Sequence, residues 1–302
     1  MVWVKQQIAG VTTFAVDGSQ IFPSKDVSIP IALVQIGWFE NPHSDQQPYC
    51  KDIDLDVMTP ADLQVRDSSQ PVDRLVNVRR LQMETERLVQ YIAQVQDKDN
   101  TLVFFDGSLV ATFAEALDDS LGKIYVGCLL KLLRASEQYR VPLVGYIDTS
   151  YAHDLTNLLE SFIGLEVTST VHDAQLLNRY MRWGDCTPVF RCDRAGILSD
   201  YQEQQDRITF TYLKAHQGYP ARLEMPLWMH EAGLVEQVVN WVRAEIIVGS
   251  GYPYAIETAD QTAVLQSKDR KIFFRVLQEW ADQQKDLNLR LSRKMVSKVM
   301  RR

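Results

Sequence analysis

Two short segments of the sequence place an aspartate directly after an apolar run and before Gly-Ser. The first is TTFAVDGSQI, which contains Asp17, and the second is TLVFFDGSLV, which contains Asp106. A carboxylate at the end of a strand is held by the sheet, while the loop that follows leaves it accessible. A single Asp-Gly-Ser is also ordinary turn chemistry, because Asp and Ser side chains satisfy nearby backbone amides. Its repetition after two apolar strands leaves both interpretations open: two local turns, or one site that takes a carboxylate from each of two strand ends.

A third carboxylate is predicted on a helix between these two segments. In VRRLQMETERLVQYI, Leu81 and Leu88 belong to an apolar stripe at helical spacing. Glu84 lies three residues after the first of these leucines and four before the second, so it shares the stripe. Glu86 points nearly the opposite way and should be solvated. We therefore expect Glu84 on the buried face of this helix.

A buried glutamate needs a partner, because an unpaired charge in an apolar interior is strongly unfavourable. Two partners remain open for Glu84: Arg80, four residues earlier in the helix, or a divalent cation held together with Asp17 and Asp106. Mg²⁺ and Mn²⁺ suit such a site, because hard cations prefer carboxylate oxygens and keep waters for substrate phosphates. Metal ions of this kind activate water and stabilise the charge that develops on a phosphodiester during hydrolysis. The three carboxylates therefore favour metal-dependent phosphodiester chemistry.

Other catalytic signatures are missing from the sequence. There is no Gly-x-Ser-x-Gly elbow, and MHEAGLVE matches only the first half of a His-Glu-x-x-His helix. The segment GSGYPY is not a phosphate-binding loop, because no Gly-Lys-Ser/Thr follows it. The chain therefore contains no recognisable ATPase and no motif for a covalent nucleophile.

The composition is that of a soluble globular protein. The chain has 302 residues, 46% hydrophobic and 24% charged, with a net charge of −7 that argues against a general polyanion-coating role. Four scattered cysteines without a Cys-x-x-Cys pair favour free thiols in a reducing compartment. No signal peptide is visible, and the longest apolar run, Ile29 to Phe39, is too short to span a bilayer. We expect a cytoplasmic protein.

The hydrophobic pattern predicts one mixed α/β domain over residues 1–302, with strands first and helices interleaved afterwards. Strands are expected before Asp17 and over 29–40, 52–58, 101–105, 141–148, 206–215 and 221–228. Helices are expected over 72–96, 109–140, 152–162, 174–181 and 231–247, with another beginning at 255.

The C-terminal tail, residues 286–302, is basic and has a helical apolar pattern. It carries six Lys and Arg residues from Arg290 onward and no acidic residue beyond that point. Two interpretations remain open: a solvated terminal helix, or a basic docking surface for nucleic acid or a protein partner.

Five motifs of the chain resemble the NurA nuclease family. They are FAVDGSQIFP, the Arg-x-x-x-Glu helix in RLQMETE, VFFDGSL, FTYLKAHQGYPARLEMPLW and GYPYAIETADQTAV. They occur in the family's order and cover roughly residues 14–265. Each is short, but together they are fairly specific.

The resemblance implies a ribonuclease-H-like fold, with a mixed sheet that carries an acidic site and helices packed around it. It also implies a manganese-dependent DNA nuclease, with 5′ to 3′ exonuclease and single-strand endonuclease activity, that processes DNA ends in double-strand-break repair. Magnesium is a further candidate metal. Members of the family form dimers and work with the hexameric DNA translocase HerA, so DNA, a HerA-type translocase and a second copy of the chain are the expected partners.

The same resemblance assigns residues to the site. Asp17, Glu84 and Asp106 match the metal ligands, and Asp260 matches a late position where some relatives have histidine. Tyr212, in FTYLK, matches a strand tyrosine near the metal. From the sequence pattern alone, Tyr212 also suits a half-buried sheet aromatic and Asp260 an exposed helix aspartate. Asp148, at another strand end, could approach the site, but no family motif matches it.

A DNA nuclease with this net charge also needs local cations. Arg179, Arg182 and Trp183 lie close together in RYMRWGD. In this combination the arginines can bind phosphate and the tryptophan can stack on a base. The same residues also suit a surface arginine pair beside a core tryptophan. Arg222, on a strand of alternating polarity, is predicted to face the DNA path.

Two classes of function follow from these residues. The first is a metal-dependent deoxyribonuclease, and the second is a catalytically silent adaptor that keeps the fold and helps a translocase hold DNA. The presence of Asp17, Glu84 and Asp106 favours the first, because a silent relative would be free to lose them. A nuclease directed at RNA or structured junctions also remains open, because recognition of the 2′-hydroxyl leaves no short motif.

Overall fold

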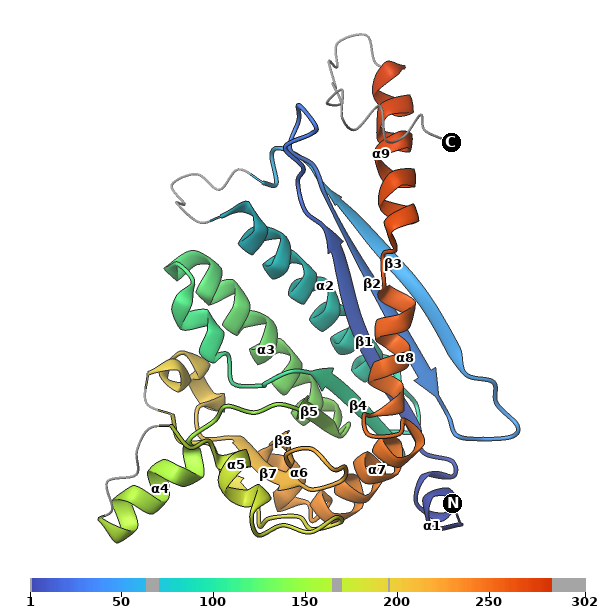
Figure 1. Cartoon of the computed structure of the whole chain (residues 1–302). Coiled ribbons are helices and arrows are strands. Elements are labelled where there is room, and N and C mark those ends of the chain that lie inside the picture. The colour runs from blue at the N-terminus through green and yellow to red at the C-terminus, as the bar shows by residue number, and fades with distance from the viewer. Residues whose placement is uncertain (1, 64–70, 165–169, 195, 284–302) are drawn as a thin grey trace.

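One mixed sheet forms the centre of the computed structural model, which describes residues 2–63, 71–164, 170–194 and 196–283 (Figure 1). Its strands are β1 (Thr12–Ile21), β2 (Ala32–Asn41), β3 (Cys50–Met58), β4 (Thr101–Asp106), β5 (Leu143–Ile147), β6 (Phe190–Arg191), β7 (Ile208–Leu213) and β8 (Ala221–Pro226). Their order across the sheet is β3-β2-β1-β4-β5-β8-β7-β6. Strands β1, β4 and β5 are parallel, and the other neighbouring pairs are antiparallel. The carboxyl ends of these three parallel strands therefore lie at the same end of the sheet.

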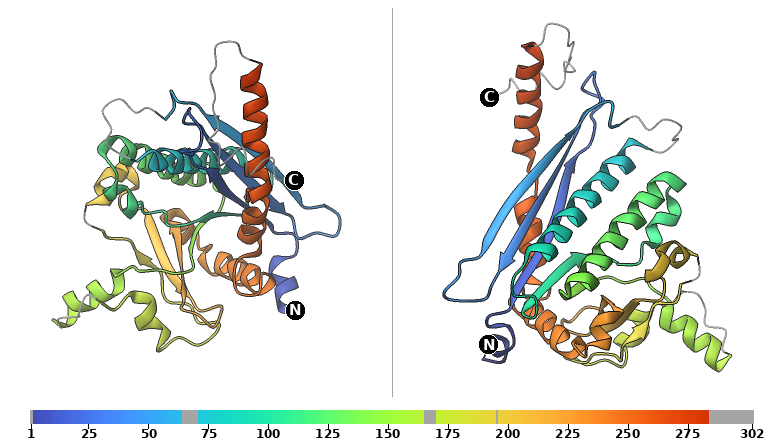
Figure 2. Two further views of the ribbon diagram at one scale, coloured as in Figure 1. Left: turned by 45° about the horizontal axis from the view of Figure 1, so that its top comes forward. Right: turned by 180° about the vertical axis from the view of Figure 1, so that it is seen from behind.

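Helices cover both faces of this sheet. They are α1 (Val2–Ile8), α2 (Val72–Gln94), α3 (Asp119–Tyr139), α4 (Asp154–Ile163), α5 (Asp173–Asn178), α6 (Leu227–Glu231), α7 (Val235–Val248), α8 (Tyr254–Ala263) and α9 (Ser267–Asp282), with 3₁₀ helices η1 (Thr112–Ala116) and η2 (Ile197–Gln204). Helices α2 and α3 lie together on one face, whereas α7 and α8 lie on the other (Figures 1 and 2). Helix α9 continues from α8 along the far end of β1 and β2.

The period of two along β1 decides which side chains meet which helices. Phe14 points toward α2, where its ring stacks on Tyr91 with the ring centroids 3.7 Å apart. Thr13 points the other way and contacts Glu245 of α7. Both faces of this strand are buried, which explains why its sequence is a nearly continuous apolar run. Asp17 belongs to the same face as Thr13 and is therefore directed toward α7 and α8.

Helix α2 packs through the stripe that its sequence predicts. Leu88 and Ile92 are fully buried against the sheet and α3, and replacing either by alanine would lower the free energy of unfolding by about 2–5 kcal/mol. The stripe includes Glu84, which is buried, whereas Glu86 is exposed. The predicted orientation of the two glutamates is confirmed.

The predicted elements occur, but two helices are divided differently, and the strand expected over 221–228 ends at Pro226, where α6 begins. The helix expected over 109–140 is two helices, η1 and α3, because Asp118 caps a new start by accepting a hydrogen bond from the Leu121 amide. The helix beginning near 255 ends at Ala263, and α9 starts separately. The basic tail at 286–302 lies outside the described residues, and the single domain over 1–302 stays a prediction. No helix in the described part of the chain is long and apolar enough to cross a membrane.

Candidate active site

The parallel register of β1 and β4 brings Asp17 and Asp106 side by side. The last paired positions are Val16 and Phe105, so the two aspartates occupy the next position on each strand. Asp106 ends β4, as predicted. The prediction that Asp17 also ends its strand is wrong, because β1 continues to Ile21 through antiparallel pairing with β2. Beyond Asp17, β1 has lost its β4 neighbour, and the sheet is open on that side.

Gly18 lets helix α2 approach β1 closely at this opening. A Cβ atom at Gly18 would lie 2.5 Å from Glu84 Oε1 and 2.7 Å from Arg80 Cγ. Real Cβ atoms do not come so close to other atoms, so any side chain here would displace Glu84 or Arg80. The glycine that follows Asp17 therefore makes room for the glutamate rather than forming a turn.

Arg80, one of the two partners considered for Glu84 from the sequence, lies nearby but does not satisfy it, and the charges of Asp17 and Asp106 also reach this carboxyl group. Arg80 Nε lies 3.5 Å from Glu84 Oε1, too far for a strong ion pair, and Oε1 has no hydrogen-bond partner although it is buried. The Arg80 guanidinium instead donates to the Gly18 carbonyl at 2.9 Å. Burial raises the pKa of Glu84 to about 8 against the opposing charge of Arg80, and the charges of Asp17 and Asp106 raise it further.

The pKa of the Asp17 carboxyl group is also raised. Burial raises its pKa to about 6, with further increases from a hydrogen bond to Asp260 and from the charge of Asp106. The hydrogen bond from the Gly18 amide and the charge of Arg80 oppose this increase. Asp260, on α8, is thus a partner of Asp17. The charges of Asp17 and Asp106 reach Glu84, and the charge of Asp260 reaches Asp106. We refer to these four groups as the acidic site.

A tyrosine that the sequence did not single out completes this side of the acidic site. The Tyr252 hydroxyl donates a 2.8 Å hydrogen bond to Asp106 Oδ1. Desolvation raises the pKa of Asp106 above its ordinary value, while this hydrogen bond opposes the increase. The charge of Asp148 also reaches Asp106, and Asp148 itself lies 3.2 Å from His216 Nε2. The only sequence signal for Tyr252 was its place in GYPYAIETAD, eight residues before Asp260.

The acidic site fits a divalent cation by charge and donor type. As they stand, the described side chains include no group of three or more His, Cys, Asp or Glu residues that could hold a metal ion. The buried, unpartnered Oε1 of Glu84 and the raised pKa values of three carboxyl groups nevertheless show that the protein alone does not compensate these groups in their ionised form. Carboxylate oxygens are the donors that Mg²⁺ and Mn²⁺ prefer.

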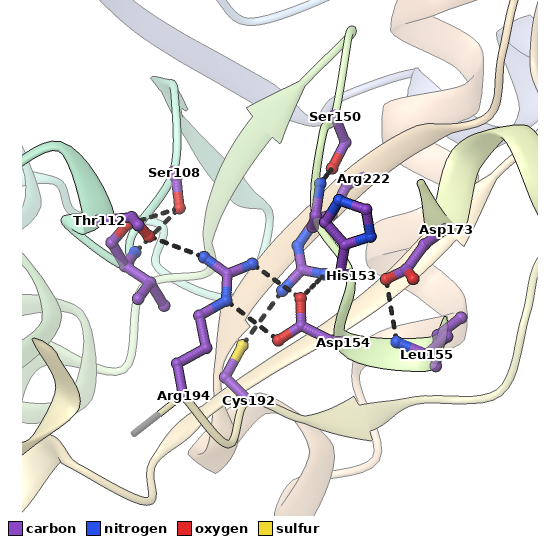
Figure 3. A network of polar contacts seen from close by, with 12 residues as sticks. Ser108, Thr112, Ser150, His153, Asp154, Leu155, Asp173, Cys192, Arg194 and Arg222 are labelled. Carbon is purple, nitrogen blue, oxygen red and sulfur yellow. Dashed lines mark hydrogen bonds and ion pairs between the residues drawn. The ribbon is translucent and has the colours of Figure 1, made fainter. Parts of the chain in front are cut away.

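Two residues predicted for the site, Tyr212 and Arg222, lie in a separate polar network, and Figure 3 shows Arg222 within it. Tyr212 is fully buried, and its hydroxyl donates to Asp173 rather than to the acidic site. Arg222 is 1% exposed and pairs with Asp154 at 2.9 Å and Glu224 at 2.8 Å. The prediction that Arg222 faces a DNA path is therefore corrected: both faces of β8 are covered, so its polar residues face a buried network instead of solvent.

The other two predicted DNA contacts are accessible. Arg179 and Arg182 are exposed, and Trp183 is 60% exposed, with its Nε1 donating to the Ala215 carbonyl at 3.0 Å. The alternative of a core tryptophan is therefore wrong. Ala215 is adjacent to His216, which contacts Asp148, so this aromatic and basic surface connects to the edge of the sheet that carries the acidic site.

The sheet order and the carboxylates on the neighbouring strands β1 and β4 define a ribonuclease-H-like fold. The chain belongs to the NurA family, because it matches the NurA domain over residues 11–265. A solved structure described as NurA has the same fold, with a TM-score of 0.53 and 10% identity over 91% of this chain and 89% of that chain. Membership of this family supports a nuclease-type function.

Two structures of endonuclease V are weaker matches. The catalytic domain of the human protein gives a TM-score of 0.41 and 15% identity over 92% of this chain and 89% of that chain. The Ciona intestinalis protein, in complex with a 24mer DNA, gives a TM-score of 0.33 and 10% identity over 91% of this chain and 95% of that chain. No curated protein matches the chain.

Proposed function

We propose that the chain is a metal-dependent deoxyribonuclease, with Asp17, Glu84, Asp106 and Asp260 as metal ligands and manganese or magnesium as the metal. The observation that carries this proposal is the acidic site: buried or crowded carboxyl groups whose ionised form the protein alone does not compensate, gathered on neighbouring strands and helices. A bound Mn²⁺ or Mg²⁺ supplies an activated water and charge stabilisation for phosphodiester hydrolysis. Tyr252 holds Asp106 through its hydroxyl and positions this ligand.

The activity that this site and family support best is DNA end processing. It comprises 5′ to 3′ exonuclease and single-strand endonuclease cleavage in double-strand-break repair, in the cytoplasm and together with a HerA-type translocase. Arg179 and Arg182 are exposed beside Trp183 and supply cations and a stacking surface for a single strand. We assign them to DNA binding and no longer include Arg222.

We also propose that the protein acts as a homodimer. Support comes from two uncovered apolar surfaces among the described residues. One is on the edge strand β3, and the other is a stripe on α9 at helical spacing. Their members are Ile53, Leu55 and Val57 of β3, and Ile272, Val276 and Trp280 of α9, all between 41% and 54% exposed. Exposed apolar surface on an edge strand favours association. Light scattering of the purified protein tests this proposal.

The test of the nuclease assignment is cleavage of end-labelled single- and double-stranded DNA with Mn²⁺, Mg²⁺ or EDTA. We expect degradation with Mn²⁺ and none in EDTA. An Asp106→Ala preparation, purified identically, controls for contaminating nucleases. DNA binding without cleavage in any metal, and without restoration by the translocase, would instead identify a silent adaptor.

Replacing Gly18 by alanine should impair cleavage by about 10²-fold, because displacing a ligand by about an ångström is enough for such a loss. The added methyl group meets Glu84 and Arg80 at distances that force them to move. The free energy of unfolding should fall by less than the roughly 1–3 kcal/mol of an overpacked core, because the atoms that must move belong to flexible side chains. Cleavage rates and chemical unfolding measure the two effects.

Gly127 provides the matched control. It lies within α3, and a Cβ atom there would meet nothing within 4 Å. The Gly127→Ala variant should cleave like the wild type and gain about 0.5–1 kcal/mol in stability, because alanine is the better helix former. Full activity of Gly18→Ala would show that the close approach of Glu84 to β1 is not required.

A further inference from the structure

A second concave site adjoins the acidic site on the α2–α3 face of the sheet. It is a pocket of about 720 Å³ bounded by the turns after β4 and β5, by η1 and by the start of α4. Ser108 and Thr149 line it, and each lies one or two residues after an aspartate, Asp106 or Asp148, at the edge that carries the acidic site. Tyr125 also lines the pocket, and the charge of Glu84 reaches its hydroxyl and raises its pKa beyond the increase from burial. The pocket therefore begins where the acidic site ends.

The floor of this pocket is a fixed set of charged pairs (Figure 3). Asp154 lies between two guanidinium groups: it accepts from Arg194 at 2.8 and 3.0 Å and from Arg222 at 2.9 Å. Glu224 accepts from Arg222 at 2.8 Å and from the Ser108 hydroxyl at 2.8 Å. Although burial alone would raise the pKa of Asp154, the hydrogen bonds and charges of the two arginines hold it below its ordinary value. Asp154 is therefore ionised, and the members of this set are paired and held in place.

The charge of the pocket distinguishes between possible ligands. The lining carboxylates are Asp154, Asp193 and Glu224, and the lining guanidiniums are those of Arg194 and Arg222. Three negative charges against two positive ones do not favour a phosphate, which needs an excess of cations. A neutral group with hydrogen-bond donors and acceptors on its edge suits such a floor better. The volume lies within the range of about 300–1,000 Å³ typical of small-molecule sites.

The mouth of the pocket carries two exposed aromatic rings from separate segments. Phe113, on η1, is 57% exposed, and Tyr151, in the β5–α4 loop, is 69% exposed. Each is supported from behind by another ring, Tyr125 and His172 respectively. Exposed, supported rings beside a polar pocket are the arrangement on which single-stranded nucleic acids stack their bases.

We propose that this pocket receives an unstacked nucleobase of the substrate strand, next to the nucleotide whose phosphate is cleaved. The inference rests on the nuclease function proposed above and adds a base-binding subsite to it. Phe113 and Tyr151 stack the base, and Asp154 and Arg194 of the floor meet its polar edge. The buried Arg222 does not touch the base but holds Asp154 in place. The sugar–phosphate backbone stays outside, toward the acidic site.

The test compares binding of two oligonucleotides of equal length in EDTA, where no cleavage occurs. One is oligothymidylate, and the other carries the same phosphates on an abasic backbone. Removing both rings in the Phe113→Ala/Tyr151→Ala variant should weaken binding of oligothymidylate by about tenfold, as expected for the loss of base stacking. Binding of the abasic strand should be unchanged, since it has no base to stack. The Tyr151→Phe variant keeps its ring and should bind both strands like the wild type.

Phe162→Ala is the matched control, because this exposed aromatic of α4 does not line the pocket. It should leave both affinities unchanged. Equal weakening of both strands in the double variant would show contact with the backbone and overturn the base pocket, as would no weakening of either. If the wild type cleaves DNA with Mn²⁺ but binds both strands equally, the pocket is wrong and the nuclease assignment stands. If it neither binds nor cleaves DNA, both proposals fail.

Discussion

The Asp106→Ala variant should cleave DNA at least about 10³-fold more slowly than the wild type and keep its fold. Charge stabilisation by a bound metal is worth several kcal/mol in a phosphodiester transition state, and about 1.4 kcal/mol corresponds to a factor of ten in rate. Asp106 ends β4 with an exposed side chain, so its carboxylate does not hold the core together. Its hydrogen bond from Tyr252 is the principal contact that would be lost. Initial rates with saturating Mn²⁺ measure the loss of cleavage, and circular dichroism measures whether the fold is kept.

Asp54 of the edge strand β3 provides a control for the loss of a strand carboxylate. It is exposed, and its Oδ1 accepts only a local hydrogen bond from the Leu55 amide. The Asp54→Ala variant should cleave normally. An unfolded Asp106→Ala variant would reassign this aspartate to a structural turn, and a folded, active one would remove it from the metal ligands.

The elements that carry the acidic site could be predicted from local pattern. Apolar runs of β1 and β4 and the helical stripe of α2 are strong signals because these elements are buried, and burial dictates the period of their side chains. The orientation of Glu84 follows from the spacing of its leucine neighbours. Asp260 carried no pattern of its own and was assigned by family resemblance; its contact with Asp17 depends on how α8 crosses the sheet.

The errors arose where tertiary structure determines the environment of a residue. Both interpretations of Asp-Gly-Ser at 17–19 end the strand at Asp17, because the sequence does not show that β2 keeps pairing with β1 past this point. Alternating polarity is typical of a strand with one solvent-exposed face, which is why the sequence predicts that Arg222 faces DNA. In the structure, the polar side chains of β8 instead belong to a buried network. Tyr252 and Tyr212 are both tyrosines in family motifs, and only the fold shows that Tyr252 contacts the acidic site whereas Tyr212 contacts Asp173.

The Glu84→Gln variant should lose cleavage by about 10²–10³-fold and yet be more stable than the wild type at high pH in EDTA. The pKa of Glu84 is about 8 in the folded protein and 4.5 in the ordinary case, so the folded state holds this proton more tightly than the unfolded chain does. The stabilisation is complete below about pH 4.5 and is lost as the pH rises through about 8. The difference between the two pKa values is worth at most on the order of 5 kcal/mol. Glutamine carries no charge in this range, so the variant should lack this decline.

Chemical unfolding at pH 5 and pH 9 measures the difference in stability between the Glu84→Gln variant and the wild type. Glu86→Gln is the control, because Glu86 is exposed on the opposite face of α2. Glu86→Gln should follow the wild type at both values and cleave normally. Mn²⁺ should raise the stability of the wild type at pH 8, because a ligand that binds only the folded state stabilises it, and should do so much less for Glu84→Gln. A variant that is less stable than the wild type at pH 9 would show that Arg80 already neutralises Glu84. In that case the buried carboxylate would be a structural ion pair, and the acidic site would have to hold its cation through the three aspartates alone.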